Sequence, residues 1–361
     1  MQKKLIALAV AGLVSAPAFA QSNVTVYGVA DAGVAFGSAG ANDLRGVLSG
    51  VLSGSRVGFR GTEDLGNGLK AVFVLEQGFD IGNGVASPGV STKRKIVDGE
   101  DEIEYTDGDS VFSRQAYVGL SGAFGTVSLG RQYAPGFGQQ YDAVASAAVS
   151  PQSILSSGAG MTITPNSPAR WDNSVAYGGS FSGLSVKAIY AARGTEVSTS
   201  PNDDDAYGLG VEYANGPLKV GAVYHYLKSA TAGSAKQKEW LLGGSYNFGV
   251  VTLAASYQDA KAVGNVKNAD ADLWQVGVIV PVGAAGNVHV AYGDVDFDNA
   301  SKAGAKSYTL AYTHALSKRT TAYAGFNRTD NDNNTSKYGV VAGTKNGNNS
   351  DVYTVGLRHT F

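Results

Sequence analysis

The stretch that decides the fold reads Tyr207-Gly-Leu-Gly-Val-Glu-Tyr-Ala-Asn-Gly-Pro-Leu-Lys-Val-Gly-Ala-Val-Tyr-His-Tyr226. Two segments in it alternate with a period of two, and the turn signal Asn215-Gly216-Pro217 separates them. In both segments one face is apolar and ends in tyrosine, whereas the other face carries glycine and hydrophilic side chains. The stretch therefore predicts two antiparallel strands joined by a tight turn.

The same alternation recurs along the chain, and it predicts strands that begin near residues 23, 53, 68, 110, 126, 170, 184, 206, 218, 238, 250, 272, 287, 306, 318 and 350. A soluble sandwich would place its bulky face inward and its charged face outward. Here the second face is small and hydrophilic, as if it lined water, and aromatic residues lie near the ends of the apolar face. This arrangement is typical of a membrane barrel, which must close because lipid cannot pair a free sheet edge.

Short and long connections alternate as well. Glycine-rich turns such as 122–125 and 283–286 alternate with longer, mostly polar connections near 80–110, 134–169, 194–205, 229–237, 261–271, 298–305 and 331–350. We therefore expect an all-β, 16-stranded antiparallel transmembrane β-barrel, with strands of about 9–11 residues and both termini on the periplasmic side. A barrel of this width leaves an aqueous channel.

Composition excludes other classes of protein. The 361 residues contain 28 Lys+Arg and 30 Asp+Glu, so bulk charge does not favour nucleic-acid binding. No cysteine is present, which rules out disulfides and thiolate metal sites. A hydrophobic content of 43% is too high for a disordered chain, and no apolar run after the N-terminus approaches the roughly 18 residues of a spanning helix. No cofactor is expected.

The first twenty residues have the layout of a secretory signal peptide. Lys3 and Lys4 precede an apolar segment over residues 5–14, and Ala18-Phe19-Ala20 matches a small-x-small cleavage site. We expect residues 1–20 to be removed and residues 21–361 to form the barrel. The mature chain would then have a formal charge of −4 in place of −2.

Several segments resemble the general trimeric porins of Gram-negative bacteria, of the type common in beta-proteobacteria. These segments occur in family order and are Val24–Asp31, Ser55–Leu69, Arg114–Leu120 with Phe124–Gln132, and Tyr353–Phe361. The resemblance implies a homotrimer of sixteen-stranded barrels in the outer membrane. Each barrel would pass ions and small hydrophilic solutes passively, in contact with outer-membrane lipid and without any nucleic-acid partner.

The chain ends in an aromatic residue after an alternating strand. Tyr353, Val355, Leu357 and Phe361 fall on one face. By resemblance, this face is the signal read by the barrel-assembly machinery, which acts with periplasmic chaperones, and a strand edge of this kind can be recognised by β-augmentation. We expect removal of Phe361 to impair assembly.

The connection from about residue 133 to residue 168 is too long for a surface hairpin and is rich in small apolar residues. It occupies the place of the family's third loop, so the resemblance implies that it folds into the pore and narrows it. By match to the family motifs, Arg56 and Arg114 belong to a basic wall and Glu76 is their acidic partner. Arg60 shares a face with Arg56, and Arg170 is a candidate for a further arginine.

Alternation is awkward for one of these arginines. Arg114 is in phase with Ala116, Val118 and Leu120, which are apolar. We therefore expect the face with Gln115 and Tyr117 to contact other subunits. The face that carries Arg114 and the smaller apolar side chains would then lie over the pore.

The third loop carries few acids. Asp142 is the sole carboxylate between residues 132 and 168. Basic wall charges would then be poorly compensated, and a narrow passage focuses their field. We therefore expect weak anion selectivity, because loop charges farther than about 8–10 Å are screened. Arg131 is expected at the trimer interface.

Three alternatives remain open. A barrel enzyme would need a nucleophile, a histidine base and a carboxylate together, yet no Gly-x-Ser-x-Gly or His-Glu-x-x-His motif accompanies His225 or His289, the two lumen-facing histidines. A substrate-specific channel would show an inward aromatic track, whereas most tyrosines other than Tyr27 read as outward. An adhesin is untested by sequence. The loops 203–205 and 330–334 could bind calcium, although solvated loop tips are the simpler interpretation.

Overall fold

A computed structural model describes residues 23–86, 94–98, 101–105, 111–138, 141–144, 146, 148–164, 170–192, 204–229, 234–298, 300 and 303–361. Within these residues one sheet contains β1(Asn23–Ala39), β2(Asn42–Ser49), β3(Arg56–Gly66), β4(Leu69–Gly78), β7(Gln115–Gly122), β8(Gly125–Tyr133), β9(Arg170–Phe181), β10(Leu184–Ala192), β11(Asp205–Asn215), β12(Leu218–Leu227), β13(Gln237–Asn247), β14(Thr252–Lys261), β15(Ala271–Val282), β16(Gly286–Phe297), β17(Ala305–Ala315), β18(Thr320–Asn331) and β19(Ser350–Thr360). A separate pair is formed by β5(Arg94–Asp98) and β6(Asp101–Tyr105).

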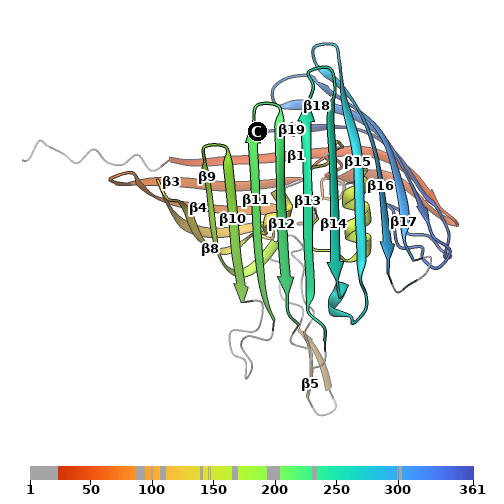
Figure 1. The fold of residues 1–361 in the computed structure, drawn as a ribbon, viewed down its shortest axis with the longest axis horizontal. Coiled ribbons are helices and arrows are strands. Elements are labelled where there is room, and N and C mark those ends of the chain that lie inside the picture. Colours follow the sequence, from red (N-terminus) through yellow and green to blue (C-terminus); the bar gives the residue numbers. More distant parts are fainter. Residues whose placement is uncertain are drawn as a thin grey trace, which may run out of the picture.

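The sheet closes on itself and its strands run side by side around the barrel (Figure 1). Every neighbouring pair is antiparallel, and β19 pairs with β1 to complete the circle. The first half of β1 pairs with β3 and its second half pairs with β2, so β2 and β3 together occupy one position in the barrel. The result is a closed 16-stranded antiparallel β-barrel, which confirms the predicted fold class.

Three strand segments escaped sequence-based prediction: β5 and β6, which lie within the connection expected near residues 80–110, and β2. β2 (Asn42–Ser49) follows a tight turn in which Gly40 has φ +64°. β1, with which β2 pairs, is 17 residues long and exceeds the expected strand length. Residues 50–55 then leave the sheet before β3 begins. We call residues 50–55 the strand break.

The two faces of the barrel differ as the alternation predicted. In β12 the apolar phase is exposed, with Tyr224 at 42%, whereas His225 on the other phase is fully buried. Aromatic rings meet between neighbouring strands on the outward face, for example Tyr190 with Tyr207 and Trp240 with Tyr257. These exposed apolar residues and paired rings form the surface that a bilayer requires.

The C-terminus lies at the closing seam. The N–H of Phe361 donates to the Gly28 carbonyl (3.1 Å), and the N–H of Gly28 donates to the Phe361 carbonyl (3.0 Å). A Cβ at Gly28 would lie 2.6 Å from the Arg56 carbonyl oxygen and 2.4 Å from the phenyl ring of Phe361, so glycine is required there. Tyr353, Val355 and Leu357 share an exposed face, with Phe361 also half exposed.

The long connection between β8 and β9 is compact. It contains α2(Pro135–Gly138) and α3(Pro151–Ala159). The Ser150 hydroxyl caps α3 by accepting a hydrogen bond from the Ser153 N–H, and Gly160 ends the helix with φ +81°. Leu155 and Met161 are buried against β15 and β16 residues and against Tyr338 from the connection before β19. We call residues 134–164 the long loop.

No helix in the described part of the chain is long and apolar enough to cross a membrane. Residues 1–20, the expected signal peptide, lie outside the described residues.

Candidate pore constriction

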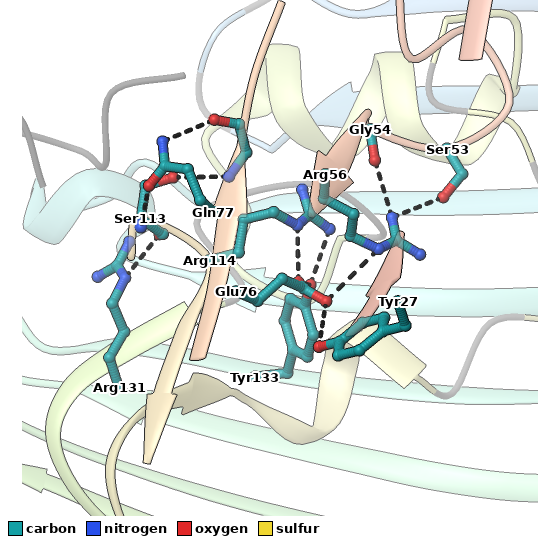
Figure 2. A network of polar contacts seen from close by, with 11 residues as sticks. Tyr27, Ser53, Gly54, Arg56, Glu76, Gln77, Ser113, Arg114, Arg131 and Tyr133 are labelled. Atoms are coloured by element: carbon teal, nitrogen blue, oxygen red, sulfur yellow. Dashed lines mark hydrogen bonds and ion pairs between the residues drawn. The ribbon is translucent and has the colours of Figure 1, made fainter. Parts of the chain in front are cut away.

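A buried carboxylate joins side chains from several strands (Figure 2). Glu76 on β4 is 3% exposed. Its Oε1 accepts from Arg114 Nε (2.8 Å) and from the Tyr133 hydroxyl (2.9 Å). Its Oε2 accepts from the Tyr27 hydroxyl (3.0 Å) and lies 3.5 Å from Arg56 Nε. Every oxygen of this carboxylate is therefore paired, as a buried charge requires.

The two arginines that pair with Glu76 also donate hydrogen bonds to other groups. Arg56 Nη1 donates to Ser53 Oγ (2.9 Å) and to the Gly54 carbonyl (2.8 Å), both in the strand break. Arg114 Nη2 donates to the Tyr133 hydroxyl (2.7 Å). Both guanidinium groups retain some solvent contact, with side-chain exposures of 20% for Arg56 and 11% for Arg114.

Arg114 reaches this cluster because it precedes the strand. β7 begins at Gln115, so the alternation of the strand does not extend to Arg114. Our expectation for the faces of β7 is therefore wrong. Val118 pairs with Phe73 on the outward face, whereas Tyr117 pairs with Val74 on the same face as Glu76.

A third predicted arginine joins the cluster. The Arg170 guanidinium lies over the Tyr133 ring at 5.4 Å and near the Phe137 ring at 6.0 Å. Arg60 lies further along β3 than Arg56, with its guanidinium over the Tyr27 ring at 5.1 Å. The aromatic faces position both groups without neutralising their charge.

The predicted loop acid has a local role. Asp142 Oδ1 accepts from the Val144 N–H (2.9 Å), and Oδ2 accepts from the Ser150 hydroxyl. These bonds order the turn that leads into α3. Thus Arg56 and Arg114 pair with Glu76 and Arg170 lies against Tyr133, which also binds Glu76, while Asp142 orders a turn within the long loop.

Sequence reasoning placed His225 in the lumen, but it did not predict that His225 and Glu239 hold the ends of this loop. Glu239 on β13 accepts from the N–H groups of Thr162 (2.8 Å) and Ile163 (3.0 Å). His225 Nε2 accepts from the Gly136 N–H (3.3 Å), and its Nδ1 lies 3.0 Å from Thr162 Oγ1. Both side chains are fully buried. The sequence feature that could have revealed these contacts is a charged or imidazole side chain on the polar phase of a strand.

A tyrosine fixes the middle of the long loop. Tyr141 is 1% exposed and donates to Glu212 (3.1 Å), and a Cβ at Gly243 would lie 2.1 Å from its ring. Burial and the Glu212 carboxylate raise the pKa of the Tyr141 hydroxyl, so this group stays protonated as a donor. Gln275 also donates to the Tyr141 carbonyl.

Three other predicted features occupy separate places. Arg131 donates to the Ser113 carbonyl (2.8 Å) and forms an ion pair with the exposed Asp172. Asp330 accepts from Arg328 Nε (2.8 Å), and Asp203 lies outside the described residues. Among the residues that the structure describes, no three His, Asp or Glu side chains are grouped to hold a metal ion.

A closed sixteen-stranded barrel with an apolar outer face and a polar, arginine-rich inner cluster defines the class of bacterial outer-membrane channels. The sequence profile of the Gram-negative porins matches residues 7–334. The chain belongs to this family. It is therefore an outer-membrane porin, a channel for passive diffusion and not an enzyme.

Individual relatives agree with this assignment. The chain is 33% identical over 380 residues to outer membrane porin protein 32 of Delftia acidovorans, with full coverage of both chains. It is 29% identical over 438 residues to an outer membrane porin protein of Bordetella pertussis, again with full coverage. The solved structure of an anion-selective porin from Comamonas acidovorans aligns with a TM-score of 0.75 and 30% identity, covering 94% of this chain and 100% of that chain.

Proposed function

We propose that this porin prefers anions weakly and that the cluster around Glu76 sets the preference. The observation that carries this proposal is that two guanidinium groups, those of Arg56 and Arg114, share the single carboxylate of Glu76, while a third, that of Arg170, lies over the ring of Tyr133 beside them. The cluster thus keeps an excess of positive charge. In a narrow passage such charge raises the local concentration of anions and lowers that of cations. The anion-selective porin from Comamonas acidovorans, which is similar over nearly the whole chain, supports the same sign.

We further propose that the long loop folds into the pore and narrows it. Support comes from its partners, which lie on the inward phases of β13, β16 and β17. Glu239 on β13 holds one end, His289 on β16 approaches the Ala143 carbonyl (2.8 Å), and Thr309 on β17 donates to the Val149 carbonyl. A loop hydrogen-bonded to several strands of the barrel wall would keep a fixed position, so the open cross-section of the pore available to solutes would stay constant.

The assembled state is also a proposal. We propose a homotrimer, exported with a cleaved signal peptide over residues 1–20 and inserted by the barrel-assembly machinery through the strand that ends at Phe361. The family resemblance and the exposed aromatic face of β19 support this view.

Liposome swelling tests the proposed transport. Vesicles that contain the purified porin are exposed to isotonic neutral sugars of increasing size, and to an organic anion and an organic cation of matched size. We expect uptake of the sugars to fall with size and the anion to enter faster than the cation. Faster entry of the cation would contradict the proposed charge preference, and uptake independent of size would contradict a constricted general pore.

A further inference from the structure

The strand break contacts two parts of the proposed constriction, the arginine wall and the long loop. Its Ser53 and Gly54 hold Arg56 (Figure 2). Its Val51 carbonyl accepts from the Ser146 hydroxyl (2.6 Å) and the Ala148 N–H (3.1 Å), both in the long loop. The strand break therefore touches the arginine wall on one side and the loop on the other.

Arg114 also depends on the shape of this segment. A Cβ at Gly54 would lie 2.9 Å from Arg114 Nη1, so the guanidinium lies directly against the backbone of the strand break. A shift of residues 50–55 would therefore displace both arginines that pair with Glu76.

A single residue on β1 holds the strand break. The Asp31 carbonyl accepts from the Gly50 N–H (2.7 Å) and the Ser55 hydroxyl (3.0 Å), which pins the segment at both ends. The Asp31 side chain then pins the middle, because its Oδ2 accepts from the N–H groups of Leu52 (2.9 Å) and Ser53 (2.7 Å). Its Oδ1 accepts from the Tyr323 hydroxyl (2.7 Å) on β18.

Asp31 is fully buried, so it does not meet permeating ions. A buried carboxylate costs free energy unless each lone pair finds a donor, and here the donors are backbone N–H groups that have left the sheet. We propose that Asp31 is a positioning residue for ion permeation: it shapes the strand break so that Arg56, Arg114 and the long loop keep fixed places around the pore. This inference rests on the proposed role of the cluster around Glu76.

The two oxygens of Asp31 allow the role to be tested. Asp31→Ala removes the bonds to Leu52 and Ser53. Asp31→Asn removes the charge but retains an oxygen for the same N–H groups. Tyr323→Phe removes the bond to Oδ1 and leaves the tether to the strand break, so it is the matched control for a general loss of packing.

Each variant is compared with the wild type in planar bilayers by open-channel current noise and by reversal potential across a KCl gradient. We expect Asp31→Ala to increase the noise and to lower the chloride-to-potassium permeability ratio by roughly twofold, because two N–H groups lose their acceptor. Asp31→Asn and Tyr323→Phe are expected to retain wild-type values. Wild-type values in Asp31→Ala would overturn the proposal, as would an equal change in Tyr323→Phe.

A second variant keeps the inference testable if Asp31→Ala fails to assemble. Ser146→Ala removes one of the two hydrogen bonds between the strand break and the long loop without touching the closing seam, and we expect it to increase the noise. Wild-type noise in Ser146→Ala would count against the strand break as a support of the loop. The sign of the wild-type reversal potential tests the proposed anion preference separately from these differences between variants.

Discussion

Replacement of Arg56 by glutamine removes one positive charge from the cluster and leaves the other hydrogen bonds of Glu76 in place. Glu76 would still accept from Arg114 Nε at 2.8 Å and from two tyrosine hydroxyls. The substitution therefore changes the field of the pore more than its shape. The expected consequence is a weaker preference for anions.

The size of this effect follows from the exposure of the side chain. Arg56 is 20% exposed, so its charge acts through a partly aqueous medium. A unit charge about 6 Å from an ion contributes roughly 0.7 kcal/mol at the dielectric constant of water. Its removal penalises chloride and favours potassium by about this amount each, which would change the permeability ratio about tenfold. Screening by salt reduces the change to about threefold at ordinary ionic strength.

The assay is the reversal potential of the Arg56→Gln variant across a KCl gradient, beside the wild type. Arg328→Gln is a suitable control, because Arg328 pairs with Asp330 and Asp351 near the end of β18 and takes no part in the cluster. We expect Arg328→Gln to leave the permeability ratio unchanged. An unchanged ratio in Arg56→Gln, or an equal change in the control, would refute the reasoning.

Three further predictions test other parts of the structure. Glu76→Gln should shift the permeability ratio about twofold further toward chloride, because the arginines lose their only close carboxylate among the described residues; a shift toward potassium would contradict this. Gly243→Ala should change the single-channel conductance by displacing Tyr141, whereas Gly178→Ala, where a Cβ meets open space, should not; equal conductances would count against the fixed loop. Deletion of Phe361 should lower the yield of heat-modifiable folded porin, while Phe361→Tyr keeps it, and a normal yield from the deletion would remove the assembly role.

The barrel could be predicted from sequence because alternation leaves a direct record of the two faces of each strand. All sixteen predicted strands correspond to strands that close the sheet. β2 was missed because its outward phase carries Asp43 and Arg45 where the other strands have apolar residues, and its pairing with β1 depends on a turn at Gly40. Its apolar residues Leu44 and Leu48 lie on the other phase and pack inside the barrel, so β2 lacks the outward apolar pattern by which the other strands were predicted.

The site was less predictable, because its geometry depends on where strands begin. Arg114 appeared to face lipid, since the alternation of β7 was extended one residue too far. Asp31 and Glu239 carry no motif, and their roles arise from backbone N–H groups that segments outside the sheet present to them. Such partners are set by tertiary structure and cannot be read from local spacing.

The most direct test of the whole account is a planar-bilayer recording of the purified wild-type protein across a KCl gradient. We predict current steps in groups of three and a reversal potential that favours chloride, as expected for three pores with uncompensated arginines. Triplet steps with a reversal potential that favours potassium would contradict the proposed role of the cluster around Glu76.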